Sequence, residues 1–177
     1  MKKQSVRLTL FLIVLSVLLL CGAASAEEAL SGSCGEALVW TLASDGTLTI
    51  SGTGPMNDTN AYYMPWRDYS EDMKTLVIED GITRIGAKCF TGCSFTEVSI
   101  PDSVTEIGAN AFAECVNLKT VDLPDITTIE AYSFYRCENL ENIVIPDTVK
   151  SIGEWAFAWT ALETITLPST VETIGSS

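Results

Sequence analysis

A pattern of 22 or 23 residues recurs through the C-terminal part of the chain, and it limits the fold more than any other feature. The text "IPDSVTEIGANAFAEC" at Ile100 to Cys115 returns as "IPDTVKSIGEWAFAWT" at Ile145 to Thr160. A unit of this length has one apolar side and nothing within itself to bury that side against. Stacking of neighbouring units solves the problem, so the repeat predicts a solenoid. The units are expected at 73–94, 95–117, 118–139 and 140–161, with a partial unit at 162–177.

Each unit is predicted to hold two short strands and a short helical turn. In "LKTVDLP", Val121 and Leu123 alternate with Thr120 and Asp122, which is typical of a half-buried strand. Pro124 then ends the strand, because proline has no N–H to donate to a ladder. A second alternating segment of the "VTEIG" type follows. The "ANAFAEC" segment that comes next brings Ala, Phe and Cys onto one side, as a turn of helix would.

Two columns of identical residues are expected inside the solenoid. Their members are Phe90, Phe112, Phe134 and Phe157 in one column, and Cys93, Cys115, Cys137 and Thr160 in the other. Threonine in the second column indicates a site for a small side chain with weak hydrogen bonding, so buried thiols are predicted. An occasional disulfide between adjacent coils remains an alternative. The cysteines lack the close CxxC spacing of a metal site, and no metal is expected.

Residues 27–72 differ from the repeats and are predicted to form an N-terminal β cap. "LVWTLASDGTLTIS" favours a hairpin, with alternating apolar residues on both sides of an "SDG" turn. The aromatic loop that follows has two interpretations. It either covers the open apolar end of the first coil, as solenoid ends require, or forms a sugar-stacking platform. The residues concerned are Tyr62, Tyr63, Trp66 and Tyr69.

Residues 1–26 are predicted to be a secretory signal peptide. Lys2, Lys3 and Arg7 precede an apolar run from Leu8 to Leu20, and "ASA" ends at Ala26. The run is shorter than the roughly 20 residues that span a bilayer, which disfavours a transmembrane anchor. A lipoprotein with a lipidated Cys21 is a further alternative, weakened by Leu20 before it. After cleavage at this point, no membrane insertion of the remaining chain is expected.

The chain is strongly acidic, with 10 Lys and Arg against 23 Asp and Glu and a formal net charge of −13. Loss of the three basic residues of the signal peptide would leave −16. Affinity for phosphate backbones depends on Lys and Arg, so nucleic acid is excluded as a partner.

The units "LxxIxIPDSVTxIGxxAFxxC" resemble the BspA-type (treponemal-class) leucine-rich repeats of secreted and surface proteins of bacteria. The lead-in "GSCGEALVWTLASDGTLTISGTG" also resembles the segment that often precedes such repeats. The resemblance implies a leucine-rich-repeat solenoid and a surface role in adhesion to host proteins or other cells, and it carries no binding motif. The departures are Glu79-Asp80 for Pro-Asp, Thr160 for Cys, and Glu130 for Gly, which indicates that a left-handed backbone is not required there.

No enzyme activity and no cofactor are expected. The sequence contains no histidine, which removes Ser-His and Cys-His nucleophiles and histidine metal sites. A carboxylate pair for glycoside hydrolysis would still be available. However, Asp102, Asp125 and Asp147 stand beside the prolines that end strands, where a solvated turn residue is the simpler explanation.

The outward positions of successive strands form the candidate binding face. They are small and mostly polar, and they suit either recognition of a partner or simple solvation; the residues are Thr75, Glu97, Ser99, Thr120, Asp122, Asn142, Val144, Thr164 and Thr166. We expect a secreted or cell-surface module that binds an extracellular protein or glycan in adhesion. The alternative is a structural spacer that displays an enzymatic or cell-wall-binding domain elsewhere in a longer protein. The last unit stops before its Phe segment, so a fragment of a longer chain is expected.

Overall fold

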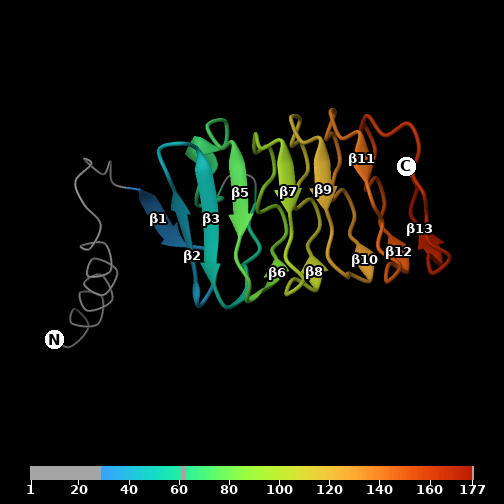
Figure 1. Cartoon of the computed structure of the whole chain (residues 1–177), viewed down its shortest axis with the longest axis horizontal. Helices are drawn as coiled ribbons and strands as arrows, with labels where there is room; N and C mark the ends of the chain where they lie inside the picture. Colours follow the sequence, from blue (N-terminus) through green and yellow to red (C-terminus); the bar gives the residue numbers. More distant parts are fainter. Residues whose placement is uncertain (1–28, 61–62, 177) are drawn as a thin grey trace.

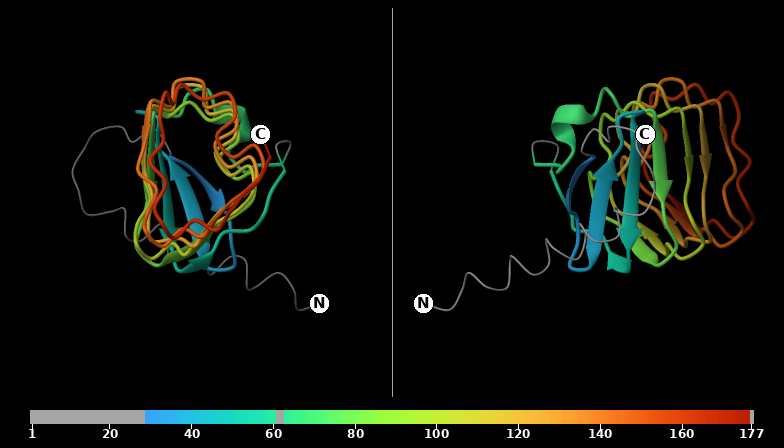
Figure 2. Two further views of the ribbon diagram at one scale, coloured as in Figure 1. Left: turned by 90° about the vertical axis from the view of Figure 1, so that its right-hand side faces the viewer. Right: turned by 60° about the vertical axis from the view of Figure 1, so that its left-hand side comes forward.

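The computed structural model describes residues 29–60 and 63–176. The signal peptide predicted at 1–26, Cys21 and Tyr62 lie outside these residues. The described chain forms an elongated stack of coils, with successive repeats lying side by side along one axis (Figure 1). Viewed along that axis, the coils nearly superimpose (Figure 2, left). The predicted solenoid of short strands is therefore confirmed.

One side of each coil carries a strand that begins the repeat. These strands are β5 (Thr75–Ile78), β7 (Glu97–Ser99), β9 (Thr120–Asp122) and β11 (Asn142–Ile143). β7, β9 and β11 pair in parallel, with Glu97 opposite Thr120 and Thr120 opposite Asn142. Alternation decides which residues face the core: Leu76, Val98 and Val121 are buried, whereas their neighbours on either side in the strands are exposed.

A second side of each coil carries a shorter strand. These are β6 (Ile82–Ile85), β8 (Glu106–Ile107), β10 (Thr128–Ile129), β12 (Ser151–Ile152) and β13 (Thr173–Ile174). β4 (Gly54–Pro55), β6 and β8 form one parallel sheet, and β10, β12 and β13 form another. The isoleucine that ends each strand is buried in β6 to β12 and exposed in β13.

The sheet on this second side is interrupted between β8 and β10, at the repeat that has Glu130 in place of glycine. The amides of Gly108 and Gly153 donate to Ile85 O at 2.9 Å and Ile129 O at 2.7 Å, in the preceding coil. A Cβ on Gly153 would lie 2.4 Å from the nitrogen of Ala131. These glycines have no left-handed φ, so they permit close approach of two coils. Glu130 carries a Cβ at the corresponding position, where the strands of the two coils do not pair.

The segment predicted as a helical turn forms consecutive tight turns instead. Each closes a coil between the second strand and the next repeat, at 86–93, 108–115, 130–137 and 153–160. Asn110 and Glu114 have φ of 58° and 61°, in the left-handed region. Their N–H groups point along the solenoid axis and donate to Ala131 O at 3.0 Å and Tyr135 O at 2.7 Å. A helix would turn these amides back onto its own carbonyls, so the coil-to-coil bonds explain the difference.

A ladder of stacked aromatic rings fills the core. Phe112 and Phe134 have ring centroids 5.7 Å apart and lie nearly parallel, at 2°. The same stacking continues to Phe157 at one end and through Phe90 to Trp66 at the other. Phe90, Phe112 and Phe134 are fully buried, whereas Phe157 is half-buried. Burial of this apolar surface on folding stabilises the stack, because one coil alone leaves both faces of its ring in water.

β1 (Leu30–Ser33), β2 (Leu38–Leu42) and β3 (Thr47–Gly52) lie at one end of the solenoid, before the repeats. These strands are antiparallel, and β3 joins β5 in parallel. β1 and β2 lie across the end of the stack (Figure 2). From β2, the buried Trp40 meets Trp66 edge-on at 5.9 Å. A short 3-10 helix, η2 (Arg67–Tyr69), follows Trp66.

Candidate binding face

The exposed side chains of β5, β7, β9 and β11 form the strand face, which is the surface the sequence predicts as a binding face. All nine predicted residues are exposed. Glu97, Thr120 and Asn142 form one row across three strands, and Ser99 lies opposite Asp122 in a second row. The strand face is thus built on paired backbone above a closely packed core: β9 is hydrogen-bonded to β7 and β11 on its two edges, whereas β5 pairs with β3.

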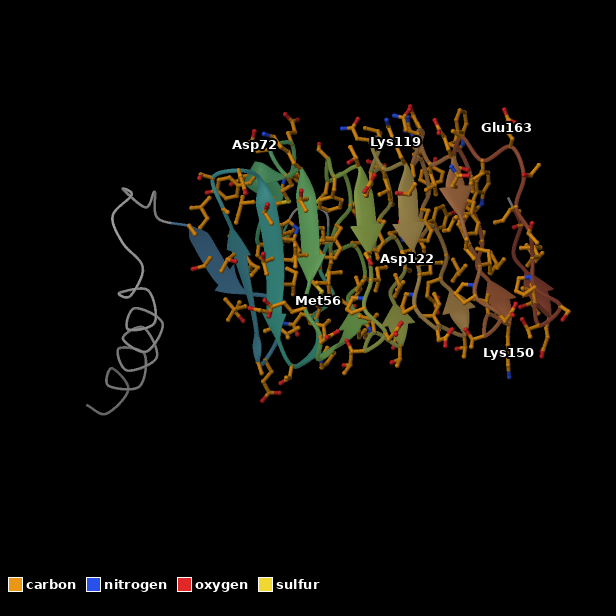
Figure 3. All side chains as sticks on the ribbon, in the orientation of Figure 1. Met56, Asp72, Lys119, Asp122, Lys150 and Glu163 are labelled. Atoms are coloured by element: carbon orange, nitrogen blue, oxygen red, sulfur yellow. The ribbon has the colours of Figure 1, made fainter. Side chains whose placement is uncertain are left out.

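The strand face carries acidic residues on β7 and β9 and a basic residue next to β9. Asp122 lies near one end of β9, whereas Lys119 precedes its other end (Figure 3). Ser99 Oγ donates to Asp122 Oδ2 at 3.5 Å, a long hydrogen bond. Asp122 and Glu97 make the middle of the strand face acidic, and Lys119 offers a cation at its edge. Such a surface can form hydrogen bonds through hydroxyl, amide and carboxylate groups.

Thr164 and Thr166 are not part of the paired sheet. The segment that carries them forms no strand in the described chain, and a groove separates it from β11. The groove has a volume of about 810 Å³, and Asn142 and Val144 line its other wall. Val144 itself lies one residue beyond β11 and is 80% exposed. The predicted strip therefore lies on strands from Thr75 to Asn142, with β5 and β7 belonging to separate sheets, and it leaves the strands after Asn142.

The cysteine column lies inside the solenoid. Cys93, Cys115 and Cys137 are buried and free. The thiols of Cys115 and Cys137 donate to carbonyl groups of the preceding coil, Phe90 O at 3.0 Å and Phe112 O at 3.1 Å. Burial raises the pKa of Cys137 to about 12 and that of Cys115 well above its usual value. The Thr160 hydroxyl instead donates to Phe157 O, within its own coil, at 2.9 Å. These thiols are poor nucleophiles, because the thiolate form is disfavoured.

The aromatic residues of the loop before the repeats do not all lie on the surface, so they cannot together form a sugar-stacking platform. Trp66 is fully buried as the first ring of the ladder, and its Nε1 donates to Cys89 O at 3.0 Å. Tyr69 is half-buried against the core. Tyr63 is 79% exposed. The sequence alone does not distinguish a cap from a sugar-stacking platform. The stacking of Trp66 on Phe90 places Trp66 in the core.

The strongest charge cluster is an ion-pair network beside the second strand. Arg84 contacts Asp58 at 2.7 Å and Glu106 at 2.6 Å, on the coils to either side. The backbone N–H of Ala87, at 2.8 Å, and the Arg84 guanidinium lower the pKa of Asp58. The network cross-links three coils. The described residues also hold no group of three or more His, Cys, Asp or Glu side chains that could bind a metal ion.

Sequence reasoning missed one surface feature. Four large aromatic residues occupy half-buried or exposed positions of two adjacent turn segments; they are Tyr132, Tyr135, Trp155 and Trp159. The corresponding positions of the two earlier coils hold Lys, Thr, Gly, Asn, Ala and Glu. Comparison of the outward positions between repeats, rather than the inward ones, would have found this cluster.

No helix within the described residues has the length and hydropathy needed to cross a membrane.

Comparison with known proteins identifies the type of repeat. A profile of the BspA-type leucine-rich repeat region matches residues 68–177 in six copies. No curated protein matches the chain.

Solved structures share the fold. A leucine-rich repeat protein from Eubacterium ventriosum ATCC 27560 is 24% identical, with a TM-score of 0.56, over 84% of this chain and 62% of that one. A leucine-rich cell surface protein from Faecalibacterium prausnitzii A2-165 is 22% identical, with a TM-score of 0.55, over 85% and 52%. The pneumococcal vaccine antigen PcpA is 16% identical, with a TM-score of 0.53, over 87% and 53%.

The chain therefore spans between half and two thirds of the length of these relatives. The profile match covers more than half of the chain, and residues 68–177 include the strands β5 to β13 of the coils. The chain belongs to the family of proteins with BspA-type leucine-rich repeats.

Proposed function

We propose that the chain is a secreted or cell-surface binding module that attaches to an extracellular protein or glycan through the strand face, without catalysis. The observation that carries the proposal is the separation of roles in β5, β7 and β9. One set of residues is buried and holds the coils together, and the alternate set is exposed and in register. The exposed set can therefore change from repeat to repeat without disturbing the core.

The extracellular location rests on two observations. The first 26 residues have the pattern of a secretory signal peptide, with a basic start, an apolar run and a small-residue end. One relative of the same fold is described as a cell surface protein. The buried free thiols are compatible with an extracellular or an intracellular location, because they form no disulfide that depends on the redox state of the compartment.

The proposal of a non-catalytic module rests on chemistry. Without histidine, a general base near neutral pH would have to be a carboxylate with a raised pKa. The carboxyl groups with a perturbed pKa, Asp45 and Asp58, are shifted downward by hydrogen bonds to backbone N–H groups and by a nearby basic side chain. Both are therefore stabilised as anions.

The test is a binding screen of the purified chain, with residues 27–177 as the mature form, against host-matrix proteins and bacterial and host glycans. The decisive variant replaces Thr120 and Asn142 by Lys, on adjacent strands of the face. A matched control replaces Thr83 and Thr105 by Lys, exposed residues on the second side of the coil. Loss of binding in the first variant alone, with unchanged circular dichroism, supports the proposal.

A different result would favour the spacer. If a well-folded chain binds nothing in the screen, or if the two lysine variants lose binding equally, the strand face is not a recognition surface. The module would then serve to hold other parts of a longer protein at a fixed distance, a role that the regular stack of coils also suits.

We also propose that β1 and β2 cap the first coil. Trp40 lies edge-on against the end of the aromatic ladder, where Trp66 would otherwise meet water. Trp40→Ala should lower the free energy of unfolding by about 3 to 5 kcal/mol, in urea titrations followed by circular dichroism. Val39→Ala, an exposed neighbour on the same strand, is the control and should change it by less than about 1 kcal/mol. Equal effects of the two variants would refute the cap.

A further inference from the structure

The four outward aromatic residues of the turn segments form one patch, the aromatic patch. Tyr132 and Tyr135 belong to one coil and meet edge-on, with ring centroids 5.5 Å apart. Trp155 and Trp159 occupy the next coil, whose turn segment is hydrogen-bonded to theirs through Arg136 N–H and Ala158 O at 2.9 Å. The turn segments lie on a different side of the coil from the strand face (Figure 2). The aromatic patch is therefore a second, separate surface.

The backbone does not favour large rings at these positions. Tyr132, Trp155 and Trp159 have φ of 59°, 56° and 61°, in the left-handed region that bulky residues avoid. Other coils hold Asn110 and Gly92 in the same columns, with the same backbone. The fold therefore needs no aromatic residue there. The left-handed conformation recurs at Asn110 and Glu114 and belongs to the fold, whereas the large rings do not recur, so the rings point to a role outside folding.

The exposure of Trp159 is a property of the coil. Trp159 is 67% exposed, whereas Tyr132, Tyr135 and Trp155 are half-buried. The residues in the same column of the two preceding coils, Glu114 and Arg136, are also exposed although a further turn segment follows each of them. Trp159 would therefore still point to solvent if another coil were stacked upon its own.

Carboxylates surround the aromatic patch. Glu154 is exposed and accepts a hydrogen bond from the Tyr132 hydroxyl at 3.4 Å. Arg136, the basic residue of these two turn segments, is paired with Glu138 at 3.5 Å. Glu130 adds a further negative charge in the same coil. The local charge is negative, as is that of the whole chain at −13.

We propose that the aromatic patch binds a basic segment of a partner protein, with Arg or Lys side chains laid on the exposed Trp159 ring and the half-buried rings beside it, and with Glu154 as counter-ion. The face of a Trp or Tyr ring attracts a cation through its quadrupole, and guanidinium groups also stack on it. The carboxylates strengthen this attraction and repel anionic ligands. This site is independent of the strand face and of what that face binds.

The experiment titrates the chain with an arginine-rich peptide at low salt and follows tryptophan fluorescence and calorimetry. The reference peptide has glutamine in place of every arginine. The arginine-rich peptide should bind and the glutamine peptide should not. Trp155→Ala with Trp159→Ala should weaken binding about 10-fold, since an exposed cation–π contact contributes a factor of roughly 2 to 5. Glu154→Gln should weaken it by a similar factor of about 2 to 5.

Matched controls separate the patch from general acidity. Tyr63→Ala removes an exposed ring outside the turn segments, and Glu97→Gln removes one negative charge from the strand face. Neither should change the affinity for the peptide by more than about twofold. If the double tryptophan variant misfolds by circular dichroism, Tyr135→Ala takes its place.

Two results would overturn the proposal. Equal weakening by the patch variants and the controls would mean that the peptide only senses net charge. Failure of the arginine-rich peptide to bind, together with binding of a neutral oligosaccharide that is lost in the Trp159→Ala variant, would make the aromatic patch a glycan site. Neither result bears on the strand face, whose own test uses Thr120 and Asn142.

Discussion

At the scale of single residues, the glycines that follow the second strand set how closely two coils can approach. A Cβ on Gly108 would lie 2.6 Å from the nitrogen of Ala87, an atom of the backbone that cannot move aside. Gly108→Ala should therefore lower the free energy of unfolding by about 2 to 3 kcal/mol, the usual effect of overpacking. Urea titrations at neutral pH, followed by circular dichroism, measure this change.

Gly92 provides the control for this prediction. It has a left-handed φ of 71°, but an added Cβ would meet no atom within 4 Å. The next coil holds Glu114 in the same conformation. Gly92→Asn should lower the free energy of unfolding by less than about 1 kcal/mol, because asparagine tolerates this backbone. The steric explanation is wrong if Gly92→Asn destabilises more than Gly108→Ala.

The buried thiols make stability depend on pH above neutrality. Burial raises the pKa of Cys137, Cys93 and Cys89 to about 12 and that of Cys34 to about 11, from an ordinary value of 9.0. Below pH 9.0 both the folded and the unfolded chain keep these protons. Above it only the unfolded chain releases them, so the free energy of unfolding should fall between pH 9 and 11 by about 1.4 kcal/mol per pH unit for each thiol.

Denaturant titrations at several pH values measure this slope. Tyrosine and lysine side chains also titrate in this range, so the comparison is with Cys137→Ala. That variant should be less stable at pH 7, since a buried group is removed, but its stability should fall less steeply with pH. A slope that is identical in the two proteins would show that the Cys137 thiol does not contribute.

At the scale of elements, the interruption between β8 and β10 is a weak point in the sheet on the second side of the coils. The amides of Gly108 and Gly153 bond to the preceding coil, whereas Glu130 N–H has no corresponding bond to Ile107. In native-state hydrogen exchange, the amide of Glu130 should exchange faster than those two glycine amides. Protection equal to theirs would show that β8 and β10 pair in solution.

The sequence was sufficient to predict the parts of each element that repeat. Spacing and alternation located the buried residues of β7 and β9 and the phenylalanine ladder, because every coil must fit its neighbour at the same points. The strand-face residues from Thr75 to Asn142 were also predicted to be exposed, and they are. These features can be recognised because the same residue types recur at the same spacing in successive repeats.

The rest was not predictable because it depends on contacts between coils. The Ala, Phe and Cys spacing fits a helical turn as well as it fits the tight turns that form, and left-handed φ at Tyr132 or Trp155 has no signature in residues other than glycine and asparagine. Thr164 has the same sequence context as Thr120, yet its segment does not pair with β11. Pairing there is decided by the neighbouring coil, which a local pattern does not describe.

At the scale of the whole molecule, the acidic excess opposes the compact fold. The chain has 23 acidic residues against 10 basic ones, and the ion pairs of the described coils centre on Arg84 and Arg136. Strands of neighbouring coils lie about 5 Å apart, so carboxylates on successive coils are within a Debye length at low salt. Their repulsion is relieved when the chain unfolds and the charges separate.

Added NaCl should therefore raise the temperature of unfolding, because the Debye length falls from about 30 Å at 0.01 M to about 3 Å at 1 M. Glu97→Gln, on the exposed strand face, should raise this temperature at the low concentration and leave it nearly unchanged at the high one. Circular dichroism during heating measures both effects. A temperature that falls with NaCl, or a gain from Glu97→Gln that persists at 1 M, would mean that packing rather than charge sets the balance.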